Sequence, residues 1–321
     1  MTQYRILNRL NIIILCVTIS SHAYATHNEI CVACNEPSSG RCGEQATWTY
    51  VGGVLTISGT GSMDNYNFST EYSPWYNNYA ICIDSTIIKN GVTNIGDYAF
   101  AWCKKMKSIS IPNSVTKIGE HAFHECDQLR SIQLPNSINT IGDYAFVWCD
   151  HLPNIDIPES VEYIGLGAFT GCYMLTNFSL PNSCTYIDIS TLSWCTNLKY
   201  LKIGDNVTNI GSYAFAWCEQ LKTIVNYTPI PPIIEENVFQ GLNRSSCTLY
   251  VPANSIDLYK RSMVWEDFII MDIANAPAPN KAEDIAIIED VHCITHKILR
   301  DGQILILRGD KTYTLTGQEV R

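Results

Sequence analysis

A cysteine recurs every 23 residues between Gly91 and Ile224. An isoleucine column, a mostly aromatic column and a glycine column keep the same period. Six consecutive registers with one period indicate a repeat array, in which each unit buries its apolar face against its neighbours. The cysteines are Cys103, Cys126, Cys149, Cys172, Cys195 and Cys218, the isoleucines are Ile95, Ile118, Ile141, Ile164, Ile187 and Ile210, and the aromatic column holds Phe100, Phe123, Phe146, Phe169, Leu192 and Phe215.

One unit, residues 114–136, shows the local structure that we expect. Residues 115–118 are strand-like, and Gly119 is expected to let the backbone turn. Positions 122, 123 and 126 have helical spacing, so one helical turn would point all three side chains inward. Each unit is therefore predicted to hold a strand, a turn and a short helical or 3₁₀ segment, with the strands stacked into one continuous parallel sheet. The inward side chains of this unit are expected to be Ala122, Phe123, Cys126, Leu129, Ile132 and Leu134.

The fifth unit departs from the consensus. Asp188 replaces the column glycine, Leu192 replaces phenylalanine, and Gly204 stands where the first four units have proline. The apolar positions remain in register, so we expect a local irregularity in this unit and no break in the array.

The repeated pattern resembles the BspA-like leucine-rich repeat. The resemblance implies an α/β repeat solenoid, a leucine-rich-repeat superhelix of about 23-residue units with a parallel sheet on its concave face. It also implies surface display and adhesin-like binding, and the family offers no catalytic residues to carry over. Residues 55–63, 73–76 and 249–268 are similar to the usual end units of the family. The pattern is Val115-Thr116-x-Ile118-Gly119-x-x-Ala122-Phe123-x-x-Cys126-x-x-Leu129-x-x-Ile132-x-Leu134-Pro135.

The N-terminus has the features of a secretion signal. Arg5 and Arg9 precede an apolar run at residues 10–19, and Ala23-Tyr24-Ala25 fits a small-x-small cleavage site. The run is too short for a membrane anchor. Export makes disulfide bonds available to the thirteen cysteines that follow the signal.

The C-terminal residues 285–321 are predicted to form a small separate β unit. Residues 304–307 and 312–315 flank Arg308-Gly309-Asp310-Lys311, which is typical of a hairpin. The tail is similar to the C-terminal sorting domains of type IX secretion, which implies passage to the outer face of a Gram-negative cell.

The parts of the chain follow from these patterns. Near the N-terminus we expect a hairpin of residues 48–51 and 54–57 and a further turn at 58–62. Near the C-terminus we expect a last strand at 248–252 and a short helix at 255–262. The predicted parts are a signal peptide at 1–25, an N-terminal segment and cap at 26–88, repeats at 89–226, a degenerate last repeat and cap at 227–274, a linker at 275–284 and the β unit at 285–321.

The cysteines outside the column leave two interpretations open. Cys31, Cys34 and Cys42 with His27 could form a zinc site, but disulfide bonding is the interpretation that we favour in an exported protein. The sequence does not determine the pairing. The cysteines concerned are Cys31, Cys34, Cys42, Cys82, Cys247 and Cys293.

Two further groups of potentially reactive side chains receive a structural interpretation. Each column cysteine follows an inward aromatic position by three residues, so we expect a small buried apolar filler, with no metal or cofactor. His121 and His124 lie beside Glu120 and Glu125, but the spacing is not that of a helical zinc motif. We expect these polar groups to face solvent because Phe123 and Cys126 must face inward.

The candidate contact residues are those that the period turns outward. A net charge of −10 argues against nucleic-acid partners. The family resemblance implies extracellular or host proteins as partners, with glycans as a second class. A structural envelope component and an accessory module of an extracellular hydrolase are the alternatives. On the sheet, the outward row is Ser110, Gln133, Asp156, Ser179 and Lys202, which either contacts a partner or is simply solvated. We expect apolar packing between coils for Trp102, Trp148, Trp194 and Trp217, with aromatic contacts to a partner as the alternative.

Overall fold

The structure is a computed structural model that describes residues 34 and 36–279, together with residues 295–300, 303–308, 311–314 and 319–320. The chain divides into two compact units, one ending at Pro277 and one beginning at Ala278. The predicted signal peptide, His27, Cys31 and Cys293 lie outside the described residues.

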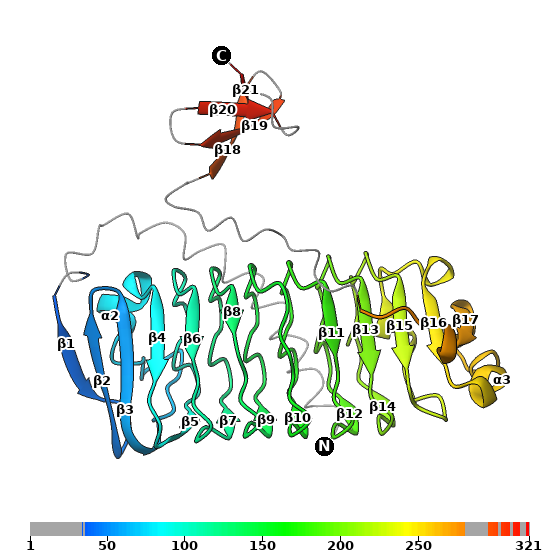
Figure 1. The fold of residues 1–321 in the computed structure, drawn as a ribbon, viewed down its shortest axis with the longest axis horizontal. Coiled ribbons are helices and arrows are strands. Elements are labelled where there is room, and N and C mark those ends of the chain that lie inside the picture. Colours follow the sequence, from blue (N-terminus) through cyan, green and yellow to red (C-terminus); the bar gives the residue numbers. More distant parts are fainter. Residues whose placement is uncertain are drawn as a thin grey trace. The chain divides into compact units, whose positions relative to one another are not determined.

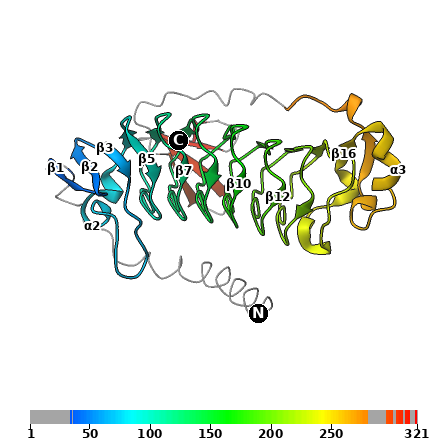
Figure 2. The ribbon, with the colours of Figure 1, turned by 90° about the horizontal axis from the view of Figure 1, so that it is seen from below.

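The first unit is a stack of coils that lie side by side (Figures 1 and 2). Most coils contribute short parallel strands at two places, so the prediction of a single continuous sheet was wrong. We call the two ladders the first sheet and the second sheet. The first sheet contains β4 (Ser85–Ile88), β6 (Ser108–Ser110), β8 (Ser131–Ile132), β11 (Asn177–Ser179), β13 (Tyr200–Ile203), β15 (Thr223–Asn226), β16 (Thr248–Val251) and β17 (Ile269–Asp272), and the second contains β5 (Val92–Ile95), β7 (Lys117–Ile118), β9 (Thr140–Ile141), β10 (Tyr163–Ile164), β12 (Tyr186–Ile187) and β14 (Asn209–Ile210).

The first sheet is interrupted between β8 and β11, in the coil that contains Pro153. In the neighbouring coils the equivalent N–H donates to the coil before it, as Arg130 N–H does to the carbonyl of Lys107 at 3.0 Å and Lys199 N–H to that of Thr176 at 2.8 Å. Proline has no N–H, so this rung of the ladder is missing. This interruption was not predicted from the sequence.

The second sheet is split between β10 and β12, in the fifth unit, where an irregularity was expected. A Cβ atom on Gly142 would lie 2.7 Å from the carbonyl carbon of Gly119. The column glycines are therefore needed because neighbouring coils approach closely, and none of them has a positive φ. Asp188 carries a Cβ at this position, which accounts for the local separation of the strands, while Ile187 and Cys195 stay buried.

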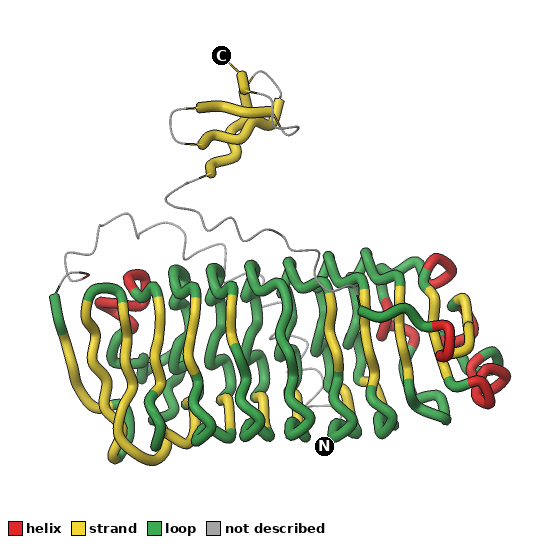
Figure 3. Tube along the Cα trace, in the orientation of Figure 1, coloured by secondary structure: helices red, strands yellow, loops and turns green. Residues whose placement is uncertain are grey.

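The predicted helical segment of each unit was wrong. No residue from Ile83 to Glu235 is helical, and helix occurs only towards the two ends of the stack (Figure 3). Every second N–H instead donates to the next coil, as Phe123 N–H does to the carbonyl of Ala145 at 2.8 Å. In this segment of each coil, two residues four positions apart adopt left-handed conformations, for example His121 with φ 51° and Glu125 with φ 52°. The inward side chains were nevertheless predicted correctly, since all six of those expected in this unit are buried.

The N-terminal cap is an antiparallel addition to the stack. Its strands are β1 (Ser38–Arg41), β2 (Gln45–Val51) and β3 (Val54–Ser62), and the pairing of Val51 with Val54 confirms the predicted hairpin. The turn expected at 58–62 was wrong, because β3 continues and pairs with β4 in the first sheet and with β5 in the second. The cap is completed by α2 (Tyr76–Tyr79) and η3 (Ala80–Cys82), which follow the buried Trp75.

The C-terminal cap adds one strand more than predicted. β16 lies at the predicted last strand, but β17 follows and pairs with it in parallel. The buried Trp265 donates its indole N–H to the carbonyl of Pro232 at 3.1 Å, which fixes the proline-rich loop. The short helices are α3 (Ile256–Tyr259), inside the predicted helix, and η4 (Glu236–Phe239), η5 (Arg244–Ser246), η6 (Ala253–Ser255), η7 (Trp265–Asp267) and η8 (Ile273–Asn275).

The second unit contains an antiparallel sheet. Its strands are β18 (Thr295–Arg300), β19 (Gln303–Arg308), β20 (Lys311–Thr314) and β21 (Glu319–Val320). Arg308 of β19 pairs with Lys311 of β20, which confirms the predicted hairpin.

Candidate interaction surfaces

The predicted outward row lies along the first sheet, on the side that we call the first-sheet face. Ser179 in β11 pairs directly with Lys202 in β13, while Ser110 ends β6 and Gln133 follows β8. Asp156 lies in the interruption of the sheet. Except for the half-buried Lys202, these residues are exposed. The exposed four make no side-chain hydrogen bond to another described residue, so their polar groups are available to a partner.

The row continues further than the sequence analysis predicted. Lys202 pairs with Val225, Val225 with Tyr250, and Tyr250 with Met271. Tyr250 is half-buried and Met271 is exposed. The 23-residue period slips after β15, so it could not identify these positions, although the alternation of residues 248–251 does point Tyr250 outward.

The four tryptophans of the second candidate surface share a strained backbone. Trp102, Trp148, Trp194 and Trp217 all have positive φ, between 56° and 63°. Non-glycine residues rarely adopt this conformation, so contacts of the side chain must offset its cost.

Their contacts divide the tryptophans into two groups. The indole of Trp148 fills the space where a Cβ on Gly171 would lie, and Trp102 packs against Tyr76 with ring centroids 5.5 Å apart. Trp194 stacks on Trp217 with ring centroids 4.5 Å apart, and 42% of Trp194 is exposed. Only Trp194 of the four is classed as exposed, so the tryptophans do not form one uniform contact row.

The prediction that His121 and His124 face solvent was wrong, because both are 7% exposed. The two Nδ1 atoms lie 2.9 Å apart. His121 is stacked between Tyr98 and Tyr144, with ring centroids 4.5 and 4.8 Å away. The error came from the expected helical turn, which would turn these side chains to solvent. In the left-handed segment the His121 side chain packs instead against the equivalent residues of the two neighbouring coils. Burial, and next the charge of His124, lowers the pKa of His121 from 6.5 to about 3.

Replacing His121 with tyrosine, the residue of the neighbouring coils, is expected to reduce the acid sensitivity of the fold. Between pH 6.5 and pH 3 the unfolded chain binds a proton at His121 that the folded chain does not. The wild type therefore loses stability as pH falls through this window, with a contribution of up to about 1.4 kcal/mol per pH unit. Chemical denaturation at a series of pH values measures this slope. Equal slopes for His121→Tyr and the wild type would contradict the assignment.

The column cysteines are buried, as predicted, but they are more than apolar fillers. The Cys126 thiol donates to the carbonyl of Phe100 at 3.1 Å, and the Cys149 thiol donates to that of Phe123 at 3.2 Å. The thiols of the next three column cysteines donate to the carbonyl of the preceding coil in the same way. These bonds run from Cys172 to Phe146, from Cys195 to Phe169 and from Cys218 to Leu192. Burial raises the pKa of Cys218 to about 12, so it stays protonated and unreactive at neutral pH.

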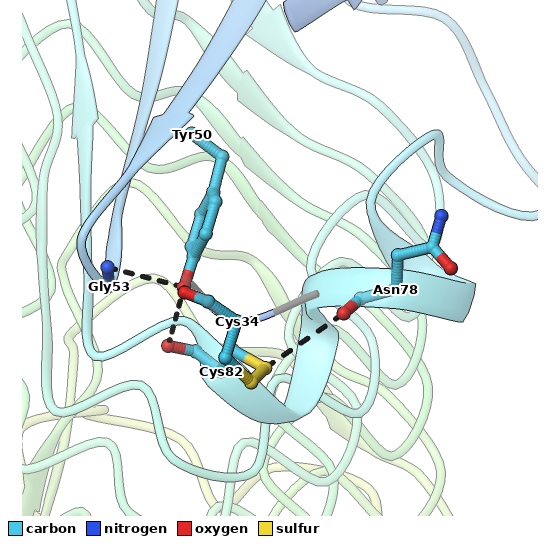
Figure 4. The surroundings of a disulfide bond; sticks show 5 residues. All are labelled: Cys34, Tyr50, Gly53, Asn78 and Cys82. Carbon is cyan, nitrogen blue, oxygen red and sulfur yellow. Dashed lines mark hydrogen bonds between the residues drawn. A yellow bond between two sulfur atoms is a disulfide. The ribbon is translucent and has the colours of Figure 1, made fainter. Parts of the chain in front are cut away.

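In the N-terminal cap, Cys34 forms a disulfide with Cys82 (Figure 4). The Tyr50 hydroxyl donates to the carbonyl of Cys34 at 3.0 Å and accepts the N–H of Gly53 at 3.2 Å. Cys42 is a separate, fully buried free thiol. The disulfide interpretation therefore holds for Cys34, and the zinc site that would have joined it to Cys42 is ruled out.

The described part of the chain contains neither a candidate metal site nor a candidate membrane-spanning helix. There, no group of three or more His, Cys, Asp or Glu side chains could hold a metal ion. No helix among the described residues is long and apolar enough to cross a membrane.

Comparisons with known proteins agree with the architecture. Residues 76–199 and 185–260 match the family model described as BspA type Leucine rich repeat region, in six copies. A T. pallidum leucine-rich repeat protein is 25% identical, with a TM-score of 0.44, over 58% of this chain and 87% of that one. A leucine-rich repeat protein from Eubacterium ventriosum is 21% identical, with a TM-score of 0.39, over 68% and 78% of the two chains. No curated protein matches the chain.

Proposed function

This chain belongs to the family of BspA-type leucine-rich repeat proteins, and we propose that it is a secreted, surface-displayed protein that binds other macromolecules without catalysis. Its expected partners are extracellular or host proteins, with glycans as the second class. In this proposal residues 1–25 direct export and residues 285–321 direct display.

The observation that supports binding is the row along the first-sheet face. Ser110, Gln133, Asp156 and Ser179 are exposed, and their side chains make no hydrogen bond to another described residue. The strands β6 and β11 fix the directions of the Ser110 and Ser179 hydroxyls, and the coils between them carry the Gln133 amide and the Asp156 carboxylate at the same 23-residue interval. Repeat solenoids use such extended surfaces for recognition. We therefore place the main contact on this face.

The proposal is tested with residues 26–321 immobilised and exposed to purified matrix proteins, plasma proteins and a glycan array. We expect at least one protein to bind, and the double variant Gln133→Arg/Ser179→Arg to bind it at least about tenfold more weakly, because large cations replace central contacts. The matched control is Thr116→Arg/Thr185→Arg, two exposed positions on or beside the second sheet, which should keep its affinity.

Three outcomes would count against the proposal. Absence of binding to every probe would favour a structural envelope component. An equal loss in both double variants would mean that added charge, and not the first-sheet face, determines affinity. If Trp194→Ala lowered the affinity while Gln133→Arg/Ser179→Arg did not, the contact would lie around Trp194 and not on the first-sheet face.

A further inference from the structure

The first-sheet face changes its chemistry along the stack. Up to β11 its outward residues are mostly small and polar, such as Ser110 and Ser131. From β13 onward lysine and tyrosine occur along this face, where Lys202 and Tyr250 are half-buried, while Tyr200 of β13 and Val225 of β15 are buried. The positions that precede β6 and β8 also carry cations, Lys107 and Arg130, so the second half differs from the first mainly in its tyrosines.

Six residues form a compact group in this second half, which we call the tyrosine–lysine patch. Lys222 N–H donates to the carbonyl of Lys199 at 3.1 Å, so these exposed lysines are neighbours in consecutive coils. Tyr227, which is 43% exposed, lies under Lys202, whose Nζ is 5.4 Å from its ring centroid. The patch comprises Lys199, Tyr200, Lys202, Lys222, Tyr227 and Tyr250.

The lysines of the patch lack acidic partners within the structure. Among the described residues, no carboxylate oxygen lies within 4.0 Å of the ammonium group of any of the three. The Nζ of Lys222 instead donates to the Ser246 hydroxyl at 3.4 Å. Near the other end of the stack, by contrast, Lys104 lies 2.7 Å from Glu125 and Lys107 lies 3.8 Å from Asp84.

The charge of this group is opposite to that of the whole protein. The chain has a net charge of −10, yet the patch contains three cations and no anion. Charged residues at the rim of an interface steer a partner of opposite charge, and tyrosines supply contact area at its centre. The combination therefore favours an acidic partner over a basic or a purely apolar one.

We infer that the tyrosine–lysine patch binds an acidic segment of a partner protein. The inference rests on the proposed function, because it uses the same face, and it specifies the chemistry of the partner. The carboxylates of the segment would pair with the three lysines, while an apolar residue between them would pack on Tyr227 and Tyr250. Because Lys199 and Lys222 are exposed and Lys202 is half-buried, the contribution of these lysines is to association rate and selectivity, and it falls as salt rises.

The test uses fluorescent twelve-residue peptides in which leucine and phenylalanine alternate with glutamate, with lysine or with glutamine. Anisotropy with the full chain should show binding of the glutamate peptide, weakened on the order of tenfold at about 0.3 M NaCl relative to low salt. The triple variant Lys199→Gln/Lys202→Gln/Lys222→Gln and the variant Tyr227→Ala should each bind at least about tenfold more weakly. The control Lys105→Gln/Lys117→Gln/Lys260→Gln removes the same charge from exposed positions outside the patch and should bind as the wild type does. Thermal melts confirm that each variant is folded.

Each other outcome would overturn the inference. The glutamate peptide could fail to bind, the glutamine peptide could bind as well as the glutamate peptide, or both triple variants could lose affinity equally. A heparin fragment that binds the patch at least about tenfold more tightly than the peptide would assign it to an anionic glycan instead. If a protein found in the screen above binds normally to the Lys199, Lys202 and Lys222 triple variant, the inference fails and the proposed function stands. If no protein binds in that screen, the proposed function fails, while the peptides still test the patch.

Discussion

Replacing Phe146 with alanine is expected to lower the free energy of unfolding by about 3–5 kcal/mol. The ring is fully buried in the middle of the stack. It lies between Phe123 and Phe169, with ring centroids 5.0 and 5.2 Å away and interplanar angles of 8° and 5°. Backbone hydrogen bonds hold the coils on both sides, including that from Phe146 N–H to the carbonyl of Ala168 at 2.7 Å. The cavity therefore cannot close by collapse, and the cost should lie in the upper range for a buried ring.

Chemical denaturation followed by circular dichroism measures this loss. The matched control is Ser179→Ala, an exposed position on the first-sheet face, where we expect a change within about 0.5 kcal/mol. Stack proteins can unfold in parts, so the transition should also be followed by intrinsic tryptophan fluorescence. Similar costs for the two variants would show that the inward and outward columns had been assigned wrongly.

The second large effect is expected from the disulfide of the N-terminal cap. The double variant Cys34→Ala/Cys82→Ala should lose about 4 kcal/mol, because the bond joins residues separated by 48 positions and restricts the unfolded chain accordingly. The bond also ties the segment before β1 to η3, next to the Tyr50 hydroxyl (Figure 4). Without it, the cap and the first coils should unfold before the rest of the stack, since each coil depends on its neighbours.

Denaturation of the wild type with and without reducing agent provides an independent measurement. Reduction should destabilise the wild type by a similar amount and leave the double variant unchanged, because the other described cysteines of this unit are already free thiols. A wild type that is equally stable when reduced would contradict the predicted contribution of this bond.

The exported location that we propose also explains why thiol burial matters. Nine described cysteines are free, and all of them are buried. An exposed thiol would be oxidised in such an environment, whereas a buried one that donates to a carbonyl has no route to an oxidant. Five of the column cysteines, from Cys126 to Cys218, thus combine core packing with a satisfied polar group.

The period of the sequence determined the side of the chain on which each repeat residue lies. Phe146, Cys149 and Ile141 recur at fixed intervals, and in a stack of equal coils a fixed interval means a fixed position relative to the core. The inward columns, the exposed row from Ser110 to Ser179 and the family could therefore be predicted without coordinates. The hairpin at Gly52 and Gly53 was predictable for a similar reason, since its turn chemistry is local.

The tertiary structure decided the features that depend on contacts between coils. The pairing of Cys34 with Cys82, the burial of His121 and the patch around Tyr227 each join residues from different parts of the chain. The left-handed segment was misread as a helical turn because both conformations place Ala122, Phe123 and Cys126 inward. They differ in the destination of the backbone N–H groups, which in this protein is the next coil. A sequence period specifies which residues occupy equivalent positions, but hydrogen bonding between coils determines the backbone conformation that places them there.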